Sequence, residues 1–420
     1  MTIQCTNIPR HPAKLLIKRN PETGQALAAV ALGLVALIGI VGLAIDMGYM
    51  RYEKRRLQSA ADSAAIAGAS ELQFASGNYA TAAKNDSKAN GFEDGVNGVS
   101  VSPSNPPADA PFSGVSNPGK YVEVQVQQVA PTFFMRIFGV NSVNLTASAV
   151  AELGSARGCV YSLGPGSGIA GGITLGGNLT APGCGVVDNS VLDLGGGCVN
   201  AASIGVVLNL LGGCATPAPI VGIAPSADPL AYLVAPAVGA CLPDPNISQP
   251  AAAPPVVIPA PPLGSAYCSI TVRATNAAQV QFTPGVYVLA RAPGLQLQGT
   301  GDVTGGGVMF YSTADAPIQI TTTGTVTLSA PTAAVAGVPG GVLFFQDRAD
   351  VQLAQIRNGI LFLTGALYFP GTQLTLGGNN ATPYLILVAQ ALQLQGNVTI
   401  GTDYSSLTDG SPIKAAYLVQ

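Results

Sequence analysis

An uncharged, apolar run near the N-terminus constrains the fold of this chain more than any other feature. Gln25–Ile45 is a stretch of 21 residues, QALAAVALGLVALIGIVGLAI, with no charged side chain. As a helix rising 1.5 Å per residue, this run is about 30 Å long, the thickness of the hydrocarbon core of a bilayer. It is longer than the apolar part of a cleavable signal, and no small-residue cleavage motif follows it. We therefore expect an uncleaved transmembrane helix over Gln25–Ile45.

The positions of the seven cysteines indicate how this helix is oriented. Basic residues lie on both sides of the run, so the positive-inside rule decides little. Cys5 is in the tail before the run, whereas the other six lie in one later stretch: Cys159, Cys184, Cys198, Cys214, Cys241 and Cys268. Six cysteines without a C-x-x-C pair or a nearby histidine favour up to three disulfides in an oxidising compartment over a zinc site. We expect residues 1–24 to be a cytoplasmic tail and the bulk of the chain to be exported. Six cysteines allow 15 disulfide connectivities. We expect pairing between sequence neighbours, because these pairs close the shortest loops.

The charge and composition exclude several classes of function. Only 9 % of the residues are charged, and the formal net charge of -3 provides no basic field for nucleic acid. The 52 glycines and 32 prolines follow no collagen period and interrupt long helices. The single histidine, His11, leaves the rest of the chain without an imidazole base or a multi-histidine metal site. We expect no cofactor, no metal, no nucleic-acid partner and no catalytic residues.

The helix is predicted to continue beyond the apolar run. Residues 46–72 contain no proline and are rich in alanine, with small or apolar side chains on one helical face: Leu57, Ala61, Ala64, Ala65 and Gly68. Such a face lets a neighbouring helix or sheet approach closely, although an ordinary amphipathic stalk has the same pattern. The alternating run Tyr121–Val126 then predicts a strand. Residues 46–152 are expected to form a long helix and a small sheet.

Residues 20–152 resemble the N-terminal domain of the TadG-like proteins of Tad/Flp (tight-adherence) pilus assembly. The resemblance is carried by the L-A-I-D-M-G exit from the apolar run and the R-R-L-Q-S-A-A-D-S-A-A-I-A-G-A run after it. The matching positions are Gly24, Asp46, Gly48, Arg55, Arg56, Leu57, Ala60, Ala61, Asp62, Ala64 and Ala65. The resemblance implies a single-pass, pilin-like inner-membrane anchor that takes part in building a surface appendage. Related pseudopilins are cut after a glycine followed five residues on by Glu; that position after Gly24 is Ala29, so we expect an intact anchor.

The remaining residues, 158–420, predict an all-β domain. Short alternating runs separated by glycine recur without a helical pattern between them, which favours a parallel β-helix, with an antiparallel β-sandwich as the alternative. The proline-rich segment 242–263 is expected to be an exposed polyproline loop, unable to join a central sheet, between two cysteines. Several phrases of this region are similar to the C-terminal regions of TadG-like proteins.

A second functional class depends on three charged residues of the β region. Asp347, Arg348 and Asp350 are candidates for the acid–base set of a carbohydrate-active enzyme or adhesin on a β-helix. We favour a structural role, in which Arg348 donates to carbonyls and Asp347 caps a turn. The expected function is therefore structural: an inner-membrane pilus-assembly component. Its expected partners are other Tad proteins or pseudopilins, membrane lipid and a cell-wall or surface glycan. The glycan would be contacted by the β domain, which is expected to be periplasmic or extracellular.

Overall fold

The computed structural model describes residues 22–74, 77–107, 118–156, 158–164, 171–250, 254–275, 279–313, 315–357 and 359–419. Cys5 and residues 1–21 of the predicted tail lie outside the described residues. The chain divides into two compact units. The first comprises the described parts of Met1–Ala64, Lys84–Ser102 and Val124–Ala149, and the second those of Ala65–Ala83, Pro103–Glu123 and Val150–Gln420.

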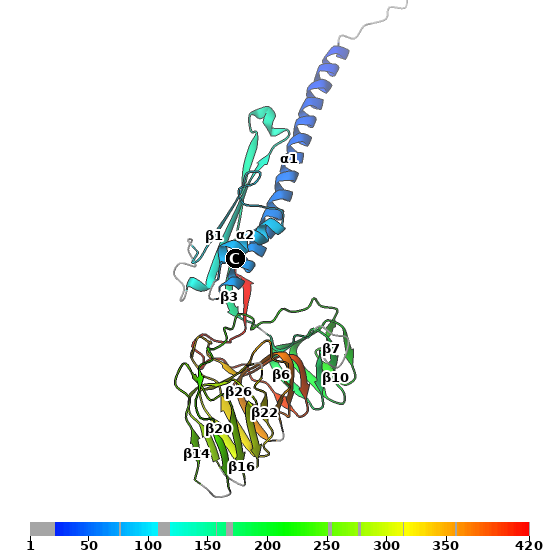
Figure 1. The fold of residues 1–420 in the computed structure, drawn as a ribbon. Coiled ribbons are helices and arrows are strands. Elements are labelled where there is room, and N and C mark those ends of the chain that lie inside the picture. The colour runs from blue at the N-terminus through cyan, green and yellow to red at the C-terminus, as the bar shows by residue number, and fades with distance from the viewer. Residues whose placement is uncertain are drawn as a thin grey trace, which may run out of the picture. The chain divides into compact units, whose positions relative to one another are not determined.

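A single long helix, α1 (Glu22–Glu71), contains both the apolar run and the alanine-rich run (Figure 1). It has no proline, and its many alanine and leucine residues have high helix propensity, so nothing in the sequence interrupts it. A second helix, α2 (Tyr79–Ala89), was not among the predicted elements. Asn78 precedes it and accepts a hydrogen bond from the backbone N–H of Thr81, the usual role of an N-cap side chain.

A small sheet contains four strands, one of which, β3 (Ser142–Ser155), is hydrogen-bonded to α1 through Gln58. Its order is β1 (Val99–Ser104), β2 (Tyr121–Pro131), β3 and β29 (Lys414–Leu418), with short 3-10 helices η2 (Pro118–Lys120) before β2 and η3 (Met135–Phe138) after it. The last strand, β29, pairs antiparallel with β3, from Lys414 opposite Ser155 to Leu418 opposite Ala151. The sequence prediction placed these residues in the β domain; instead they cover the free edge of β3.

The second unit contains a 23-stranded sheet whose strands form three parallel ladders. The first ladder is β13 (Asn246–Gln249), β16 (Ile270–Ala274), β19 (Leu295–Gly299), β22 (Ile318–Ile320), β25 (Ala354–Ile356), β26 (Ile360–Leu376), β27 (Leu385–Leu394), β5 (Ile173–Leu175), β7 (Val191–Asp193) and β9 (Asn209–Leu211). The second ladder includes β14 (Val256–Ile258), β17 (Gln279–Phe282), β20 (Asp302–Gly305), β23 (Thr325–Ser329) and β26, and then β28 (Val398–Thr399), β6 (Leu179–Asp188), β8 (Cys198–Val206) and β10 (Cys214–Thr216).

The third ladder passes through the long strands β26 and β27. It consists of β18 (Gly285–Leu289), β21 (Val308–Ser312), β24 (Val342–Gln346), β26, β27, β4 (Gly158–Ser162), β6, β8 and β11 (Ile220–Val221). A separate parallel pair joins β12 (Ala240–Cys241) to β15 (Ser265–Ala266). Because the pairings between the strands of these ladders are parallel, the antiparallel sandwich considered as an alternative is wrong for this region.

The core lies between the ladders, where equivalent side chains stack. Ile270, Leu295 and Ile318 are register partners on three successive strands, and all three are fully buried. In the third ladder, the rings of Tyr287, Phe310 and Phe344 stack with centroid separations of 5.2 and 5.3 Å. The apolar residues of the predicted runs therefore point inward, while glycines and polar residues occupy the turns between strands.

The chain enters this stack of strands in its middle. β27 pairs with β4 and β5, and β28 pairs with β6. The strands that come last in the sequence of this region therefore lie next to those that come first. β10 lies toward one end and β14 toward the other, with β6 and β26 between them (Figure 1). Residues 222–239, here called the crossing segment, connect β11 at one end to β12 near the other.

The proline-rich segment 242–263 departs from the prediction. Two parts of it, β13 and β14, join the sheet by pairing with β16 and β17. Neither strand contains a proline, and both are at an edge, where a neighbouring proline removes no ladder hydrogen bond. The expectation that this segment cannot join the sheet is therefore wrong, because its prolines flank the strands.

Candidate functional site

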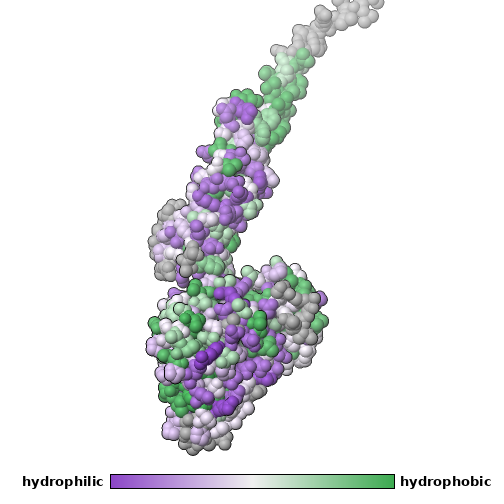
Figure 2. Space-filling model, viewed as in Figure 1, coloured by the Kyte–Doolittle hydropathy of each residue, from purple (hydrophilic) through white to green (hydrophobic). Residues whose placement is uncertain are grey.

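The first candidate surface is the apolar part of α1. Within the described residues, Ala26–Glu71 is long and apolar enough to cross a bilayer: its most apolar window has a mean hydropathy of 2.7 and is only 6 % buried. Leu37, at 64 % exposure, is typical of this stretch. Figure 2 shows the same part of the helix as a continuous apolar surface. The core helix of a soluble protein would bury such side chains.

Asp46, at the end of this apolar part, accepts three hydrogen bonds from one loop, an arrangement here called the clasp. Its side chain is almost completely buried. The backbone N–H of Phe133 donates to Oδ1 at 2.9 Å, and those of Phe134 and Met135 donate to Oδ2 at 2.9 and 2.6 Å. Three hydrogen bonds from a loop that starts η3 thus satisfy a carboxylate that would otherwise be costly to bury. The loop joins β2 to β3, so Asp46 attaches this hairpin to α1.

Two further contacts hold the same loop on α1. The rings of Tyr49 and Phe133 meet edge to face with centroids 5.2 Å apart. The Phe134 ring lies over Gly42: a Cβ atom at Gly42 would be 2.7 Å from the ring, so only glycine leaves room for it. The sequence identified Asp46 only as a family position. The run Phe133–Phe138 was available as a signal for its partner, because it places exposed aromatic residues between two strands.

The matched run after Asp46 forms the interface between α1 and its own sheet. Leu57, Ala60, Ala61, Ala64 and Ala65 are fully buried. On this side the Gln58 amide donates to the carbonyl of Ser148 in β3 at 3.0 Å, and Lys54 Nζ donates to the carbonyl of Thr146. The small-residue face is therefore buried, with β3 hydrogen-bonded beside it, and is not free to receive another helix.

Two other matched positions, Arg56 and Asp62, make polar or ring contacts beside this interface. Arg56 forms an ion pair with Glu53 at 3.2 Å and lies over the ring of Phe92, with its guanidinium 5.3 Å from the centroid. Asp62 accepts a hydrogen bond from the Gln58 amide at 2.7 Å. Gly48 and Arg55 are exposed, and Gly24 lies in the first turn of α1.

The six clustered cysteines form three disulfides between sequence neighbours. The pairs are Cys159–Cys184, Cys198–Cys214 and Cys241–Cys268. Cys198 and Cys214 are register partners in β8 and β10, so this bond ties the last strand of one ladder to its neighbour. Cys241–Cys268 attaches the far end of the crossing segment near β16. Structural disulfides of this kind are typical of exported proteins.

The charged residues considered for catalysis have structural partners. Arg348 Nη2 donates to the carbonyls of Leu230, Ala231 and Leu233 in the crossing segment, at 3.0 to 3.2 Å. Asp347 Oδ1 accepts from the backbone N–H of Ala349 two residues on, as a turn-capping side chain does. This is the arrangement predicted for a structural role.

Two other carboxylates complete this polar cluster. Asp350 is fully buried and accepts from the Gln346 amide and from the backbone N–H of Gln352; burial raises the pKa of its carboxyl above the ordinary value. Asp228, in the crossing segment, accepts from the hydroxyl of Tyr368. The cluster thus fastens the crossing segment to β24 and β26. Within the described residues, no group of three His, Cys, Asp or Glu side chains could hold a metal ion.

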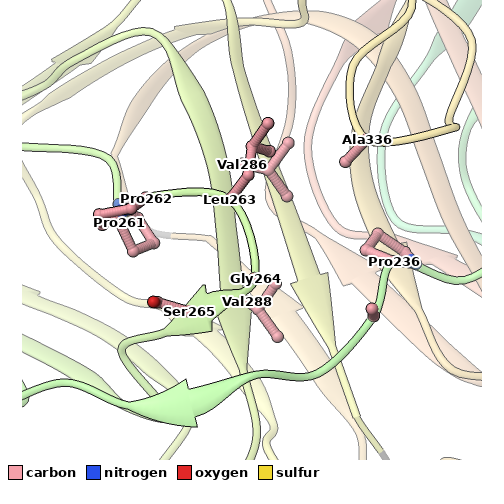
Figure 3. A pocket seen from close by; sticks show the side chains of 10 residues that line it. Pro236, Pro261, Pro262, Leu263, Gly264, Ser265, Val286, Val288 and Ala336 are labelled. Atoms are coloured by element: carbon pink, nitrogen blue, oxygen red, sulfur yellow. The ribbon is translucent and has the colours of Figure 1, made fainter.

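An apolar cavity of 260 Å³ lies where the crossing segment meets β15 and β18 (Figure 3). Its lining includes prolines, valines and small residues: Pro236, Ala237, Pro261, Pro262, Leu263, Gly264, Ser265, Val286, Val288 and Ala336. Because none of these side chains is charged, the cavity offers apolar contact and no acid–base chemistry.

Comparison with known families addresses the N-terminal third of the chain. Residues 24–71 match the family model described as Flp pilus-assembly TadE/G-like, and residues 67–151 match the one described as Tad-like Flp pilus-assembly. No curated protein and no solved structure matches. The two matches cover α2, β1, β2 and most of α1 and β3, including Asp46 and the loop that binds it. Residues 24–151 of this chain are therefore similar to the Tad-type regions of the Flp pilus-assembly families.

Proposed function

We propose that this chain is a membrane-anchored structural component of a Tad/Flp-type pilus-assembly system. The observation that carries the proposal is the pair of family matches over 24–151, on the same residues that form the exposed apolar helix and its attached sheet. In this proposal Gln25–Ile45 is the span, in the inner membrane, and residues 46–152 form a pilin-like unit beyond it. The matched positions from Arg55 to Ala65 then serve to hold the sheet on the helix.

The proposed orientation puts residues 1–24 in the cytoplasm and the rest of the chain in the periplasm or outside the cell. The three disulfides support it, because structural disulfides persist in oxidising compartments. The tail contains the only cysteine outside these bonds, Cys5. An intact, uncleaved tail is part of the proposal.

We also propose that residues 158–413 form a parallel β-helix. Three ladders of parallel strands, in which Ile270, Leu295 and Ile318 stack in register, support this architecture. Such a coil presents long, sparsely charged flanks. We infer that these flanks contact other pilus-assembly proteins or an envelope glycan. An acid–base role is not part of the proposal, because Asp347 and Arg348 already bond to backbone groups.

Orientation is tested by labelling Cys5 with a membrane-impermeant maleimide in intact spheroplasts and again after the membrane is permeabilised. Labelling only after permeabilisation supports a cytoplasmic tail, and labelling of intact spheroplasts contradicts it. A Cys5→Ser variant is the control for labelling of any other thiol.

The assembly role is tested by deleting the gene in its host and restoring it with variants. Loss of surface pili on deletion, and recovery with the wild-type chain, is the expected result. Asp347→Asn and Asp350→Asn, introduced singly, should also restore piliation, because neither carboxylate is assigned chemistry. Normal piliation in the deletion strain would contradict the proposal. Failure of a stably folded Asp347→Asn chain to restore pili would favour the enzyme alternative.

A further inference from the structure

The loop that clasps Asp46 carries exposed apolar side chains that the family matches do not explain. Here the hairpin tip is defined as residues Phe133–Val140, between β2 and β3. Ile137 is 76 % exposed and Phe138 is 73 % exposed, and Phe133 and Val140 are also exposed. Large apolar side chains gathered in one short loop cost free energy in water unless something covers them.

The position of this tip along α1 indicates what covers it. Backbone groups of the tip bond to Asp46, one residue beyond the proposed span, and the Phe134 ring lies over Gly42, inside the span. Gly42 is four residues before Asp46, about 6 Å closer to the bilayer centre along the helix. The tip is therefore beside the last turn of the span, at the depth where a bilayer changes from hydrocarbon to headgroups.

The backbone of the tip suits a site with little water. Besides the three N–H groups that donate to Asp46, those of Ile137, Gly139 and Val140 donate to carbonyls within the tip, and that of Thr132 donates to Asn141. A loop in contact with lipid needs this internal satisfaction, because hydrocarbon provides no hydrogen-bond partners. A loop facing only water would not need it.

The charge of the region is also compatible with a membrane surface. No acidic residue occurs between Glu123 and Glu152, and the tip contains one basic residue, Arg136, which is exposed. Aromatic side chains beside an arginine are a usual composition at the interface of anionic bilayers. A protein partner that covers the same patch is the alternative outcome of the test below.

We propose that the hairpin tip inserts Ile137 and Phe138 into the lipid interface beside α1, as a second membrane contact of this chain. The inference rests on the proposed function, since it requires Gln25–Ile45 to span the bilayer. Asp46 is a positioning residue: its carboxylate fixes the tip at the height of the bilayer surface. The pilin-like sheet is then attached to the membrane at two points, which restricts its tilt about α1.

The test uses the absence of tryptophan from the chain. Three full-length variants each introduce one tryptophan: Leu37→Trp in the span, Phe138→Trp in the tip, and Val351→Trp in the β domain. Val351 is matched to Phe138, because both are 73 % exposed. Each variant is reconstituted into vesicles of phosphatidylcholine and phosphatidylglycerol that carry bromine either near the headgroup or near the end of the acyl chains.

We expect Leu37→Trp fluorescence to be quenched most by bromine deep in the chains, and Phe138→Trp fluorescence to be quenched most by bromine near the headgroup. Val351→Trp should keep its fluorescence in both. If Leu37→Trp is quenched while Phe138→Trp behaves like Val351→Trp, the tip inference is overturned and the anchor stands. If Leu37→Trp is not quenched, the anchor fails, and the inference fails with it.

A further variant tests the positioning role of Asp46. Asp46→Asn in the Phe138→Trp background leaves one side-chain oxygen to accept where two accepted before, so the clasp is weakened. The quenching of Phe138→Trp by shallow bromine should fall. Asp46→Asn combined instead with Leu37→Trp should leave the quenching of Leu37→Trp unchanged. Equal quenching of Phe138→Trp with Asp and Asn at position 46 would overturn the positioning role.

Discussion

The register of the parallel ladders can be tested by a pair of introduced cysteines. Thr304 in β20 and Thr327 in β23 are register partners, and both are exposed. Adjacent strands are about 4.8 Å apart, within the range that a disulfide bridges. The chain already contains such a bond, since Cys198 and Cys214 are register partners with Cα atoms 4.6 Å apart. In a Cys5→Ser background, Thr304→Cys with Thr327→Cys should therefore cross-link on mild oxidation.

The matched control displaces one cysteine by two residues along the same face. Thr304→Cys with Ser329→Cys adds about 6.6 Å along the strand, so the two Cα atoms are roughly 8 Å apart, beyond the reach of a disulfide. Non-reducing electrophoresis and intact mass measure both pairs. The in-register bond closes a loop of 23 residues, which in the chain-entropy description adds about 3 kcal/mol of stability. Equal cross-linking of the two pairs, or none in the first, would refute the ladder register.

Three further outcomes are expected. Leu57→Ala, at a fully buried position between α1 and its sheet, should lower the free energy of unfolding by about 2–5 kcal/mol in a denaturant titration, and a change near zero would contradict that packing. The hydrogen bond from Lys84 to Asp94, 2.8 Å long, lowers the pKa of the Asp94 carboxyl. Its contribution to stability, roughly 0.2–1 kcal/mol for an exposed pair, is present above the unfolded pKa of about 3.9 and is lost as the pH falls through the lower folded value. Asp94→Asn should therefore weaken stability at neutral pH but not at strongly acidic pH, and an equal loss at both would contradict this. Replacing Cys241 and Cys268 by serine should cost about 3 kcal/mol and expose the crossing segment to limited proteolysis, whereas an unchanged digestion pattern would show that the bond does not hold that segment.

Local sequence patterns predict the elements of this fold well. The long helix follows from the absence of proline in Glu22–Glu71, and the inward-facing strands follow from alternation, as in Val326–Leu328. The neighbour pairing of the cysteines follows from loop length. These features depend on residues close together in the chain, so local composition and the spacing of apolar residues are enough to predict them.

The order of the strands in space is not predictable in the same way. Nothing near β4 signals that it pairs with β27, because parallel ladder partners are joined only through distant chain and each strand is compatible with several neighbours. β29 was missed for the same reason: KAAYL has a weak alternation, and its pairing with β3 is a tertiary contact. The aromatic run Phe133–Phe138 signals that this loop needs a partner, but it does not identify Asp46, since the donors to Asp46 are backbone N–H groups that any residue has.

The mid-stack entry of the chain explains where two of the three disulfides lie. Because β4 and β27 meet in the middle, neither end of the stack contains a chain terminus, and each end leaves a strand with an unpaired edge that could pair with another molecule. Cys198–Cys214 closes the strands at one end, and Cys241–Cys268 fixes the crossing segment at the other, next to strands flanked by proline. A disulfide therefore lies near each end of the stack. Reduction of these two bonds is expected to leave the end strands freer to fray and to associate with another molecule.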